Sequence, residues 1–293
     1  MPSLKEVKNR ITSVISTQQI TKAMRMVAAS KLRRSQERIH QIRPFAGKLQ
    51  GIVSNLTASI GSDNDNDWYA AKRVENRILV VAITSDRGLC GGFNSAVLKA
   101  TVKLVQEKYP TQFSSGNVTI LPFGKRSMEF FSKRKFTCLD SYWGIFGQLS
   151  YANAAKAGDH IIDTFKKGGY DKVEIVYNEF KNVATQVLRI EQFLPLTLES
   201  SSVANAPDYI FEPNAEEVLA GLIPQLLNVQ LYRAILESNA AEHAARMTAM
   251  DKASENAGEL LKELKLAYNR SRQAAITKEI LEIVGGAEAL KSA

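Results

Sequence analysis

Apolar residues recur at alternating spacings of three and four along the first 60 residues. The positions on this seam are Leu4, Val7, Ile11 and Val14, and then Ala28, Leu32, Ile39, Ile42, Ala46, Leu49, Val53, Leu56 and Ile60. This spacing is typical of a coiled coil, in which two helices bury a shared seam. Between the two runs the seam holds Gln18, Thr21 and Arg25, so its apolar character is interrupted. Pro44 should kink or locally break the helix, because proline lacks a backbone N–H and clashes with the preceding turn.

The period changes after residues 61–68, an acidic and polar stretch that we expect to be a loop. Apolar runs rich in β-branched residues predict strands at 77–84, 118–123, 173–180 and 187–196, and helical patterns fall at 95–108, 125–133 and 151–167. Alternating strands and helices favour a layered α/β domain over residues 75–200, with a mainly parallel sheet and a closing hairpin.

From about Asn214 the chain returns to a helical pattern and keeps it. The seam positions there are Met247, Met250, Ser254, Ala257, Leu261, Leu264, Tyr268, Ser271 and Ala275. Many of them are small or polar, which lets two helices approach closely. We therefore predict three parts: an N-terminal coiled-coil helix (1–60), the α/β domain (75–200) and a C-terminal coiled-coil helix (213–293), with the two helices paired antiparallel.

Charge is distributed unevenly along the chain. The formal net charge is +8, yet residues 1–60 alone carry +9 and residues 212–293 carry −3. A basic arm indicates an anionic partner, which could be nucleic acid, a lipid surface or an acidic protein surface. Its basic run 22–38 contains no aromatic residue for base stacking, which argues against single-stranded nucleic acid. Two cysteines do not form a disulfide framework, and we expect neither a secretory signal nor a membrane span.

Residues 85–94 (SDRGLCGGFN) lie between a predicted strand and a predicted helix, where an α/β domain can bind phosphate. The glycines do not match GxGxxG, and the chain has no GxxxxGK[ST] motif. Asp86 and Arg87 do not complete a catalytic set, and Cys90 fits a small apolar filler better than a reactive thiol. We expect no catalytic, cofactor-binding or metal site. We therefore interpret this segment as a tight turn or as a loop that binds a partner protein. Nucleotide binding is the alternative.

Four segments identify a family. They are TKAMRMVAASKLRR (21–34), SDRGLCGGFN (85–94), VQLYRAILESNAAEHAARMTAM (229–250) and RQAAITKEILEIVGGAEAL (272–290). In order and position they resemble the signature segments of ATP synthase gamma subunits, in a bacterial-like form. The resemblance implies a non-catalytic central rotor shaft: an antiparallel coiled coil inside a ring of three alpha and three beta subunits, with a Rossmann-like α/β foot near epsilon and the membrane c-ring.

The resemblance also implies which residues contact partners. For the alpha–beta ring these are Lys22, Met24, Arg25, Met26, Arg246, Arg272, Gln273 and Thr277, and the interaction loop supplies Asp86, Arg87 and Cys90. Rotation of one copy per complex would couple proton translocation to ATP synthesis or hydrolysis on beta, without a cofactor and without nucleic acid. The complex would sit on the cytoplasmic side of the inner (plasma) membrane. A nucleotide-binding α/β protein and a basic coiled-coil adaptor are the alternatives.

Overall fold

The computed structural model describes residues 3–60, 68–71, 73–197, 212 and 214–291, so most of the loop expected at 61–68 lies outside the described residues. These residues form two compact units. One comprises Ala29–Arg246, and the other joins the two ends of the chain, up to Ala28 and from Met247 onward. Each unit is described by itself.

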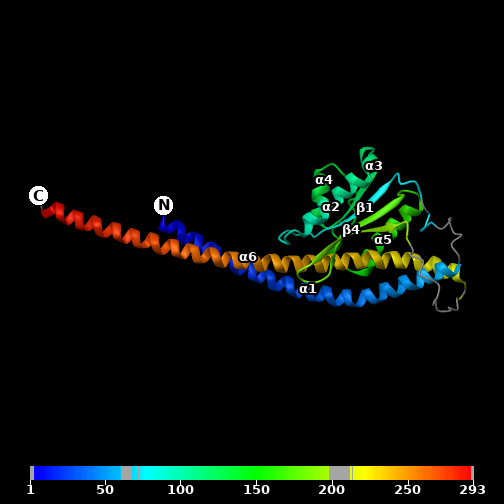
Figure 1. Ribbon diagram of the computed structural model, residues 1–293, viewed down its shortest axis with the longest axis horizontal. Coiled ribbons are helices and arrows are strands. Elements are labelled where there is room, and N and C mark those ends of the chain that lie inside the picture. The colour runs from blue at the N-terminus through cyan, green and yellow to red at the C-terminus, as the bar shows by residue number, and fades with distance from the viewer. Residues whose placement is uncertain (1–2, 61–67, 72, 198–211, 213, 292–293) are drawn as a thin grey trace. The chain divides into compact units, whose positions relative to one another are not determined.

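A five-stranded sheet forms the centre of the larger unit. Its strands are β1 (Ile78–Ile83), β2 (Val118–Phe123), β3 (Thr137–Cys138), β4 (Lys172–Phe180) and β5 (Gln186–Leu194). The order is β3-β2-β1-β4-β5, with β1 to β4 parallel and β5 antiparallel to β4. The neighbouring strands β1 and β4 are labelled in Figure 1. The sheet is therefore mixed, and the prediction of a layered α/β domain with a closing hairpin is confirmed.

Helices cover both faces of this sheet. α2 (Phe93–Lys108) and α4 (Lys125–Lys133) cover one face, and α5 (Tyr151–Lys166) packs on the other. The short helix α3 (Pro110–Ser114) follows α2, and a 3-10 turn lies at Ile145–Gln148. Val80 on β1 faces the cluster that contains Val97 and Phe131, whereas Val81 faces the cluster that contains Ile161. Because both faces of β1 are buried, its sequence is continuously apolar rather than alternating. The short α3 and β3 carry no sequence pattern that distinguishes them from loop.

Two long helices, α1 (Leu4–Ile60) and α6 (Ala215–Lys291), pack together. α6 begins after a reciprocal cap, in which Asn214 Oδ1 accepts the Glu217 N–H at 2.8 Å and the Glu217 carboxylate accepts from Asn214 Nδ2 at 2.9 Å. Of the two outcomes predicted at Pro44, the local break is wrong, since α1 continues on both sides of it, and the kink stays a prediction. The preceding residue, Arg43, is bound by Glu237 and by the Phe180 carbonyl, which fixes the helix where proline removes one backbone bond.

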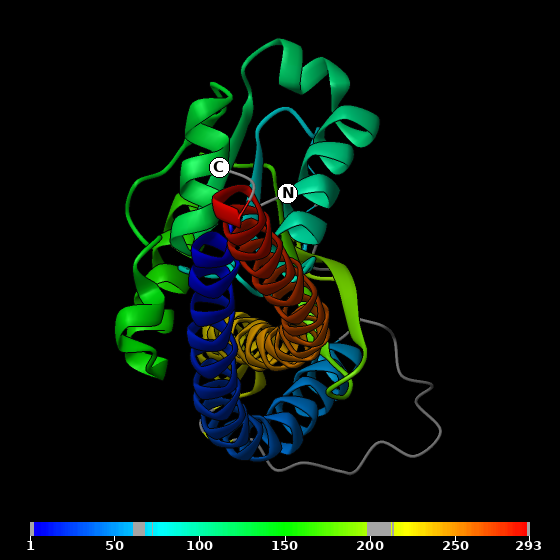
Figure 2. The same cartoon turned by 90° about the vertical axis from the view of Figure 1, so that its left-hand side faces the viewer.

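The smaller unit is an antiparallel pair of helical segments (Figure 2). Thr21 Oγ1 lies 2.7 Å from Ser254 Oγ, and Arg25 Nη1 lies 2.7 Å from Asp251 Oδ1, so residue numbers rise along α1 as they fall along α6. The buried residues of the seam are Val7, Thr21 and Ala28 on α1, and Met250, Ser254, Ala257 and Leu261 on α6. All of these buried residues lie at predicted seam positions. The prediction is wrong at Arg25, which is exposed while Met24 beside it is half-buried, and the polar interruption is a hydrogen-bonded layer at Thr21.

One described helix, α6 over Ala215–Ala287, is long and apolar enough to cross a membrane by length and composition alone. Half of its most apolar window is buried inside the protein. Core helices of soluble proteins meet the same criterion, so it does not identify a membrane span.

Gly124 precedes α4 and lies where the chain leaving β2 packs closely against the residue that follows β1. It has φ +98°, and a Cβ added there would lie 2.3 Å from the Thr84 carbonyl oxygen. Gly116 has φ +74° with open space around it. Gly116→Ala should therefore cost about 1 kcal/mol of unfolding free energy, which is the backbone strain alone. Gly124→Ala should cost at least about 3 kcal/mol, because a backbone atom must also move. Urea unfolding measures both variants, and equal losses would contradict the predicted collision.

Candidate functional site

The loop between β1 and α2, residues 85–94, is closed by its own polar groups. Ser85 N donates to Asn94 Oδ1 at 2.9 Å, Ser85 Oγ donates to the Arg87 carbonyl at 2.6 Å, and Asn94 Nδ2 donates to Cys90 Sγ at 3.2 Å. The Cys90 side chain lies inside this ring of bonds, and the residue is only 2% exposed. Cys90 therefore supports the loop from within, while Arg87 is on the surface.

Arg246 on α6 holds the same loop from the outside. Its Nη2 donates to the carbonyls of Arg87 at 3.1 Å and Gly88 at 3.3 Å, and its Nη1 donates to the Glu242 carboxylate one turn earlier on the helix. The side chain of Arg246 is only 12% exposed. On the other flank of the loop, Asp86 Oδ1 accepts the Lys125 N–H at 3.1 Å and so caps the start of α4.

We call the hydrogen bonds of Arg246 to this loop the Arg246 clamp. Burial shifts the pKa of two groups beside it. It raises the pKa of Glu242, although the Arg246 guanidinium opposes the rise. It lowers the pKa of His243 to about 4, and the positive charges of Arg246 and Lys31 push the pKa in the same direction. His243 is therefore neutral at neutral pH. His243 Nδ1 also lies 3.5 Å from Arg246 Nη1, so the imidazole packs beside the guanidinium.

The carboxyl ends of β1 and β4 form the position where doubly wound sheets bind ligands, because helical connections leave this point in opposite directions. Here α6 occupies that position. Ser238 Oγ donates to the Ile83 carbonyl at 3.5 Å, and Glu237 Oε2 accepts the Phe180 N–H at 3.2 Å. Glu237 also binds Arg43 from α1. Side chains of the chain's own helices thus lie where a nucleotide would lie, which argues against the nucleotide-binding alternative.

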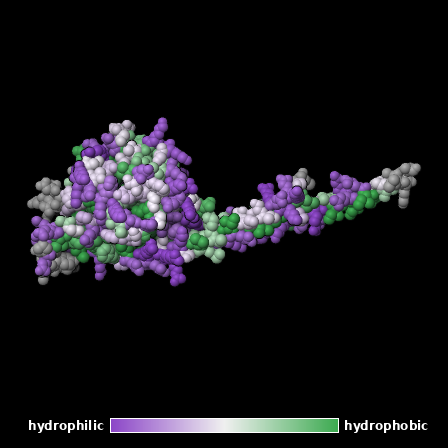
Figure 3. Space-filling view, turned by 180° about the vertical axis from the view of Figure 1, so that it is seen from behind, coloured by the Kyte–Doolittle hydropathy of each residue, from purple (hydrophilic) through white to green (hydrophobic). Residues whose placement is uncertain are grey.

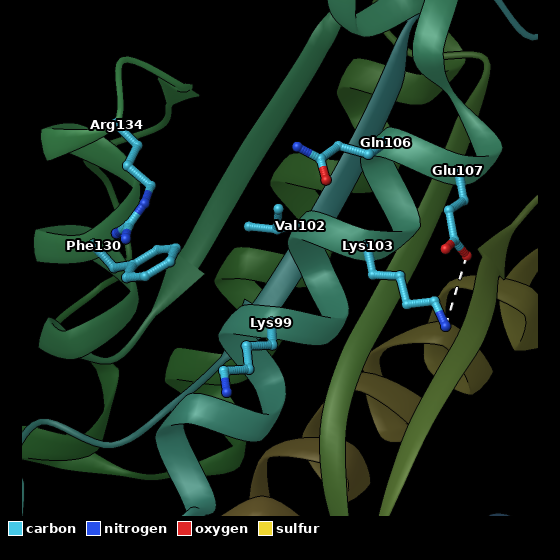
Figure 4. A pocket seen from close by; sticks show the side chains of 7 residues that line it. All are labelled: Lys99, Val102, Lys103, Gln106, Glu107, Phe130 and Arg134. Atoms are coloured by element: carbon cyan, nitrogen blue, oxygen red, sulfur yellow. Dashed lines mark ion pairs between the residues drawn. The ribbon is translucent and has the colours of Figure 1, made fainter.

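The described groove between α2 and α4 has a volume of about 290 Å³ and is the one drawn in Figure 4. Arg134 stacks over the Phe130 ring at 3.7 Å, and Lys103 pairs with Glu107 at 3.8 Å. The groove lies on the sides of two helices, and the one carboxylate that lines it, Glu107, is paired with Lys103 on the same helix. Within the described ranges, no three His, Cys, Asp or Glu side chains are placed to hold a metal ion.

In the helix pair, three of the predicted contact residues line one groove of about 550 Å³. They are Lys22, Arg25 and Met26, and the opposite wall from α6 includes Asp251, Glu255 and Glu259. Met26 is 64% exposed, whereas Met24 is half-buried and does not line the groove. The carboxylates of α6 partly neutralise the basic face of α1, which weakens the case for a nucleic-acid adaptor.

The remaining predicted contacts lie further along α6. Arg272, Gln273 and Thr277 are all exposed, and Thr277 Oγ1 donates to the Gln273 carbonyl at 3.0 Å. The same stretch exposes the apolar side chains of Ile276, Ile280, Leu281, Ile283 and Val284. Green, apolar residues follow this end of α6 in Figure 3. The antiparallel register places the start of α1 opposite about Ser271, so this apolar strip continues beyond the pairing.

The structure therefore places the predicted residues at three locations: the clamped loop, the groove of the helix pair and the exposed part of α6. Glu237, Glu242 and His243 contribute to the first of these or to its support, and none of them was predicted. Glu237 binds Phe180, 57 residues away in sequence, and Arg43, 194 residues away. Glu242 and His243 owe their shifted pKa values first to burial. Periodicity on one helix does not report either property.

Comparisons with known proteins agree with this architecture. The profile of the family described as ATP synthase matches residues 3–290. The chain is 55% identical to the ATP synthase gamma chain of Cytophaga hutchinsonii, over all of both chains. It is 47% identical to the gamma chain of Chlorobium phaeobacteroides, over 99% of this chain and all of that one.

Solved structures share the fold. A chain of the Tetrahymena thermophila mitochondrial ATP synthase, in its central stalk and c-ring structure, aligns with a TM-score of 0.57 and 26% identity, over 80% of this chain and 99% of that one. A chain of the Euglena gracilis mitochondrial enzyme in rotational state 3 aligns with a TM-score of 0.67 and 20% identity, over 98% of this chain and 94% of that one. At that identity the second likeness shows the fold alone.

The family profile and the full-length relatives define the class of this chain as a non-catalytic subunit of ATP synthase. The chain belongs to the ATP synthase gamma chain family. Its function is that of the central-stalk rotor of an F-type ATP synthase, a non-catalytic subunit of a membrane-associated, proton-transporting complex.

The buried imidazole of His243 predicts a pH dependence of stability. Its pKa is lower in the folded chain than the value of about 6.5 of an unfolded histidine, so protons bind the unfolded chain first as pH falls. Stability is therefore lost between about pH 6.5 and pH 4. We expect His243→Gln to remove about 2 kcal/mol of the fall in unfolding free energy between pH 7 and pH 5.

Urea unfolding at both pH values measures this difference. The raised pKa of Glu242 acts with the opposite sign, and the comparison between wild type and variant isolates the imidazole. His40→Gln, on the exposed face of α1, is the control for loss of a histidine. An unchanged pH dependence in His243→Gln would contradict the assignment.

Proposed function

We propose that this chain turns inside a ring of three alpha and three beta subunits, one copy per complex, and couples proton translocation to ATP synthesis or hydrolysis on beta. The observation that carries the proposal is the apolar strip of α6 from Ile276 to Val284, which extends beyond its pairing with α1. An exposed apolar strip of this length indicates a protein surface that encloses it. A hydrophobic sleeve at the top of the ring is the partner that we propose.

Coupling follows from unequal contacts. A shaft with different side chains around its circumference binds each of three otherwise equivalent beta subunits differently. Each angle of the shaft therefore favours a different set of beta conformations, and rotation changes nucleotide affinity at each site in turn. The chain supplies such asymmetry, because the groove of the helix pair has Lys22 and Met26 on one wall and Glu255 and Glu259 on the other.

The predicted contact residues take distinct places in this proposal. Lys22, Met24, Arg25 and Met26 would face an acidic lever segment of beta, to which exposed lysine and methionine side chains are complementary in charge and shape. Arg272, Gln273 and Thr277 would reach a loop of beta higher in the ring. Arg246 would act from the foot, where its guanidinium fixes the loop of Asp86, Arg87 and Cys90.

The foot would bind epsilon and the membrane c-ring on the cytoplasmic side of the inner membrane. Support comes from the Tetrahymena thermophila relative, whose structure is described as central stalk and c-ring. The complex would need no cofactor on this chain, and no nucleic acid.

Reconstitution with alpha and beta subunits from the same source tests the proposal. We expect a complex that contains one copy of this chain for three copies of each partner, and ATPase activity that depends on the chain. Native mass spectrometry gives the stoichiometry, and a coupled ATPase assay gives the activity. A chain that stays free of alpha and beta, or a complex whose activity is the same without it, would overturn the proposal.

A charge reversal at the basic face makes the proposal specific to a residue. Lys22→Glu should lower the ATPase rate of the reconstituted complex several-fold, because a favourable charge contact becomes a repulsive one of about 1–3 kcal/mol. Lys103→Glu on α2 makes the same change of charge on the foot and serves as the control. Rates for both variants at low and high salt check the result. Equal rates for the two variants would show that Lys22 does not take part in the contact with beta.

A further inference from the structure

Leu89, at the tip of the loop between β1 and α2, has an unfavourable conformation. Its φ is +62°, in the left-handed region that favours glycine, and the residue is 65% exposed. Among the described residues other than glycine, only Leu89 and Lys135 have positive φ. The loop has glycine at 88, 91 and 92, and yet it places an apolar side chain at the strained position. Backbone strain and exposed apolar surface both oppose this arrangement, which points to a role outside the chain.

Hydrogen bonds hold the backbone on both sides of Leu89. Before it, the carbonyls of Arg87 and Gly88 accept from Arg246, and the Arg87 carbonyl also accepts from Ser85 Oγ. After it, the Cys90 carbonyl accepts the Phe93 N–H at 3.2 Å, and the Cys90 side chain lies in the core of the loop. The tip is therefore presented in one conformation, so that little conformational entropy remains to be lost on binding.

The surroundings of the tip are basic. Arg87 and Lys125 are exposed, and Arg126 lies so close that a Cβ added to Gly88 would be 3.4 Å from its Nη2. Glu129 pairs with Arg126 at 3.1 Å and neutralises one of these charges. Asp86 is half-buried and occupied with the start of α4. An apolar side chain surrounded by positive charge is complementary to an apolar pocket with a carboxylate rim.

We propose that Leu89 is the apolar anchor by which this loop binds a beta subunit, in an apolar pocket rimmed by carboxylates. The inference rests on the proposed function, which supplies the ring as the partner. Arg246 is a positioning residue in this account: it holds the tip in the binding conformation, and Glu242 holds Arg246. The anchor explains why the loop keeps leucine where glycine would remove the strain.

Competition during assembly tests the anchor. Wild-type and variant chains with different affinity tags are mixed in equal amounts with a limiting quantity of alpha and beta subunits, and the tags are counted in the purified complex. Leu89→Asn tolerates the left-handed conformation but loses the apolar surface, so it should be incorporated about tenfold less than wild type. Leu89→Met should compete within about twofold.

Lys135→Asn is the matched control. Lys135 has φ +59°, so the substitution changes backbone strain in the same way at a position after α4. It should be incorporated as wild type. Equal incorporation of Leu89→Asn and wild type would overturn the anchor. Failure of the wild-type chain itself to assemble would overturn the proposed function instead, so the two failures are distinguishable.

Alkylation of Cys90 tests the positioning role on the full chain without partners. In a Cys138→Ser background, Cys90 is the remaining thiol, and it should react slowly with iodoacetamide because it is buried beneath the loop. Arg246→Gln should raise its alkylation rate at least tenfold by releasing the carbonyls of Arg87 and Gly88, whereas Leu89→Asn should leave the rate unchanged. An Arg246→Gln chain with wild-type alkylation would show that the clamp does not position the loop.

Discussion

The antiparallel packing of α1 against α6 is the interaction on which the other features depend. In the smaller unit it is a narrow seam of small and polar residues, fixed in register by the pair Thr21 and Ser254. A buried polar pair on a helix seam stabilises little by itself, but it disfavours every other register, because a shift would leave hydroxyl groups buried without partners. In the larger unit the same two helices supply Val53 and Leu227 to one face of the sheet.

α6 binds both the sheet and the loop at residues 85–94 through polar side chains, which a helix that only packs against the sheet would not need. Glu237 and Ser238 bind the ends of β4 and β1, and Arg246 binds the following loop from a position two turns further along the helix. The crevice that binds nucleotides in related α/β domains is thereby used to attach a helix. This is a structural reason why a Rossmann-like sheet can serve in a non-catalytic subunit.

The sequence predicts an element and its buried face well where the pattern within that one element is sufficient. The buried strand β1 has a continuous apolar run, and the seams of α1 and α6 follow their spacing, so these elements could be predicted within about two residues. The local break allowed for at Pro44 does not occur: propensity is local, whereas the bonds of Arg43 to Glu237 and Phe180 come from the tertiary fold. The hydrogen bonds of Arg246 to the loop could not be predicted from the sequence for the same reason. Their acceptors are backbone carbonyls, which every residue has. The contact residues came from resemblance to a family, not from residue chemistry.

The most direct test of this account is a disulfide between the two helices at the polar layer, in chains that carry Thr21→Cys and Ser254→Cys and are assembled with alpha and beta subunits. The hydroxyl oxygens of these residues are 2.7 Å apart, so the cysteines should bridge readily on oxidation. If the helix pair turns as one shaft in this register, the locked complex should form the bridge in full and hydrolyse ATP at the rate of the reduced complex. Absence of the bridge, or loss of activity that reduction restores, would contradict the account.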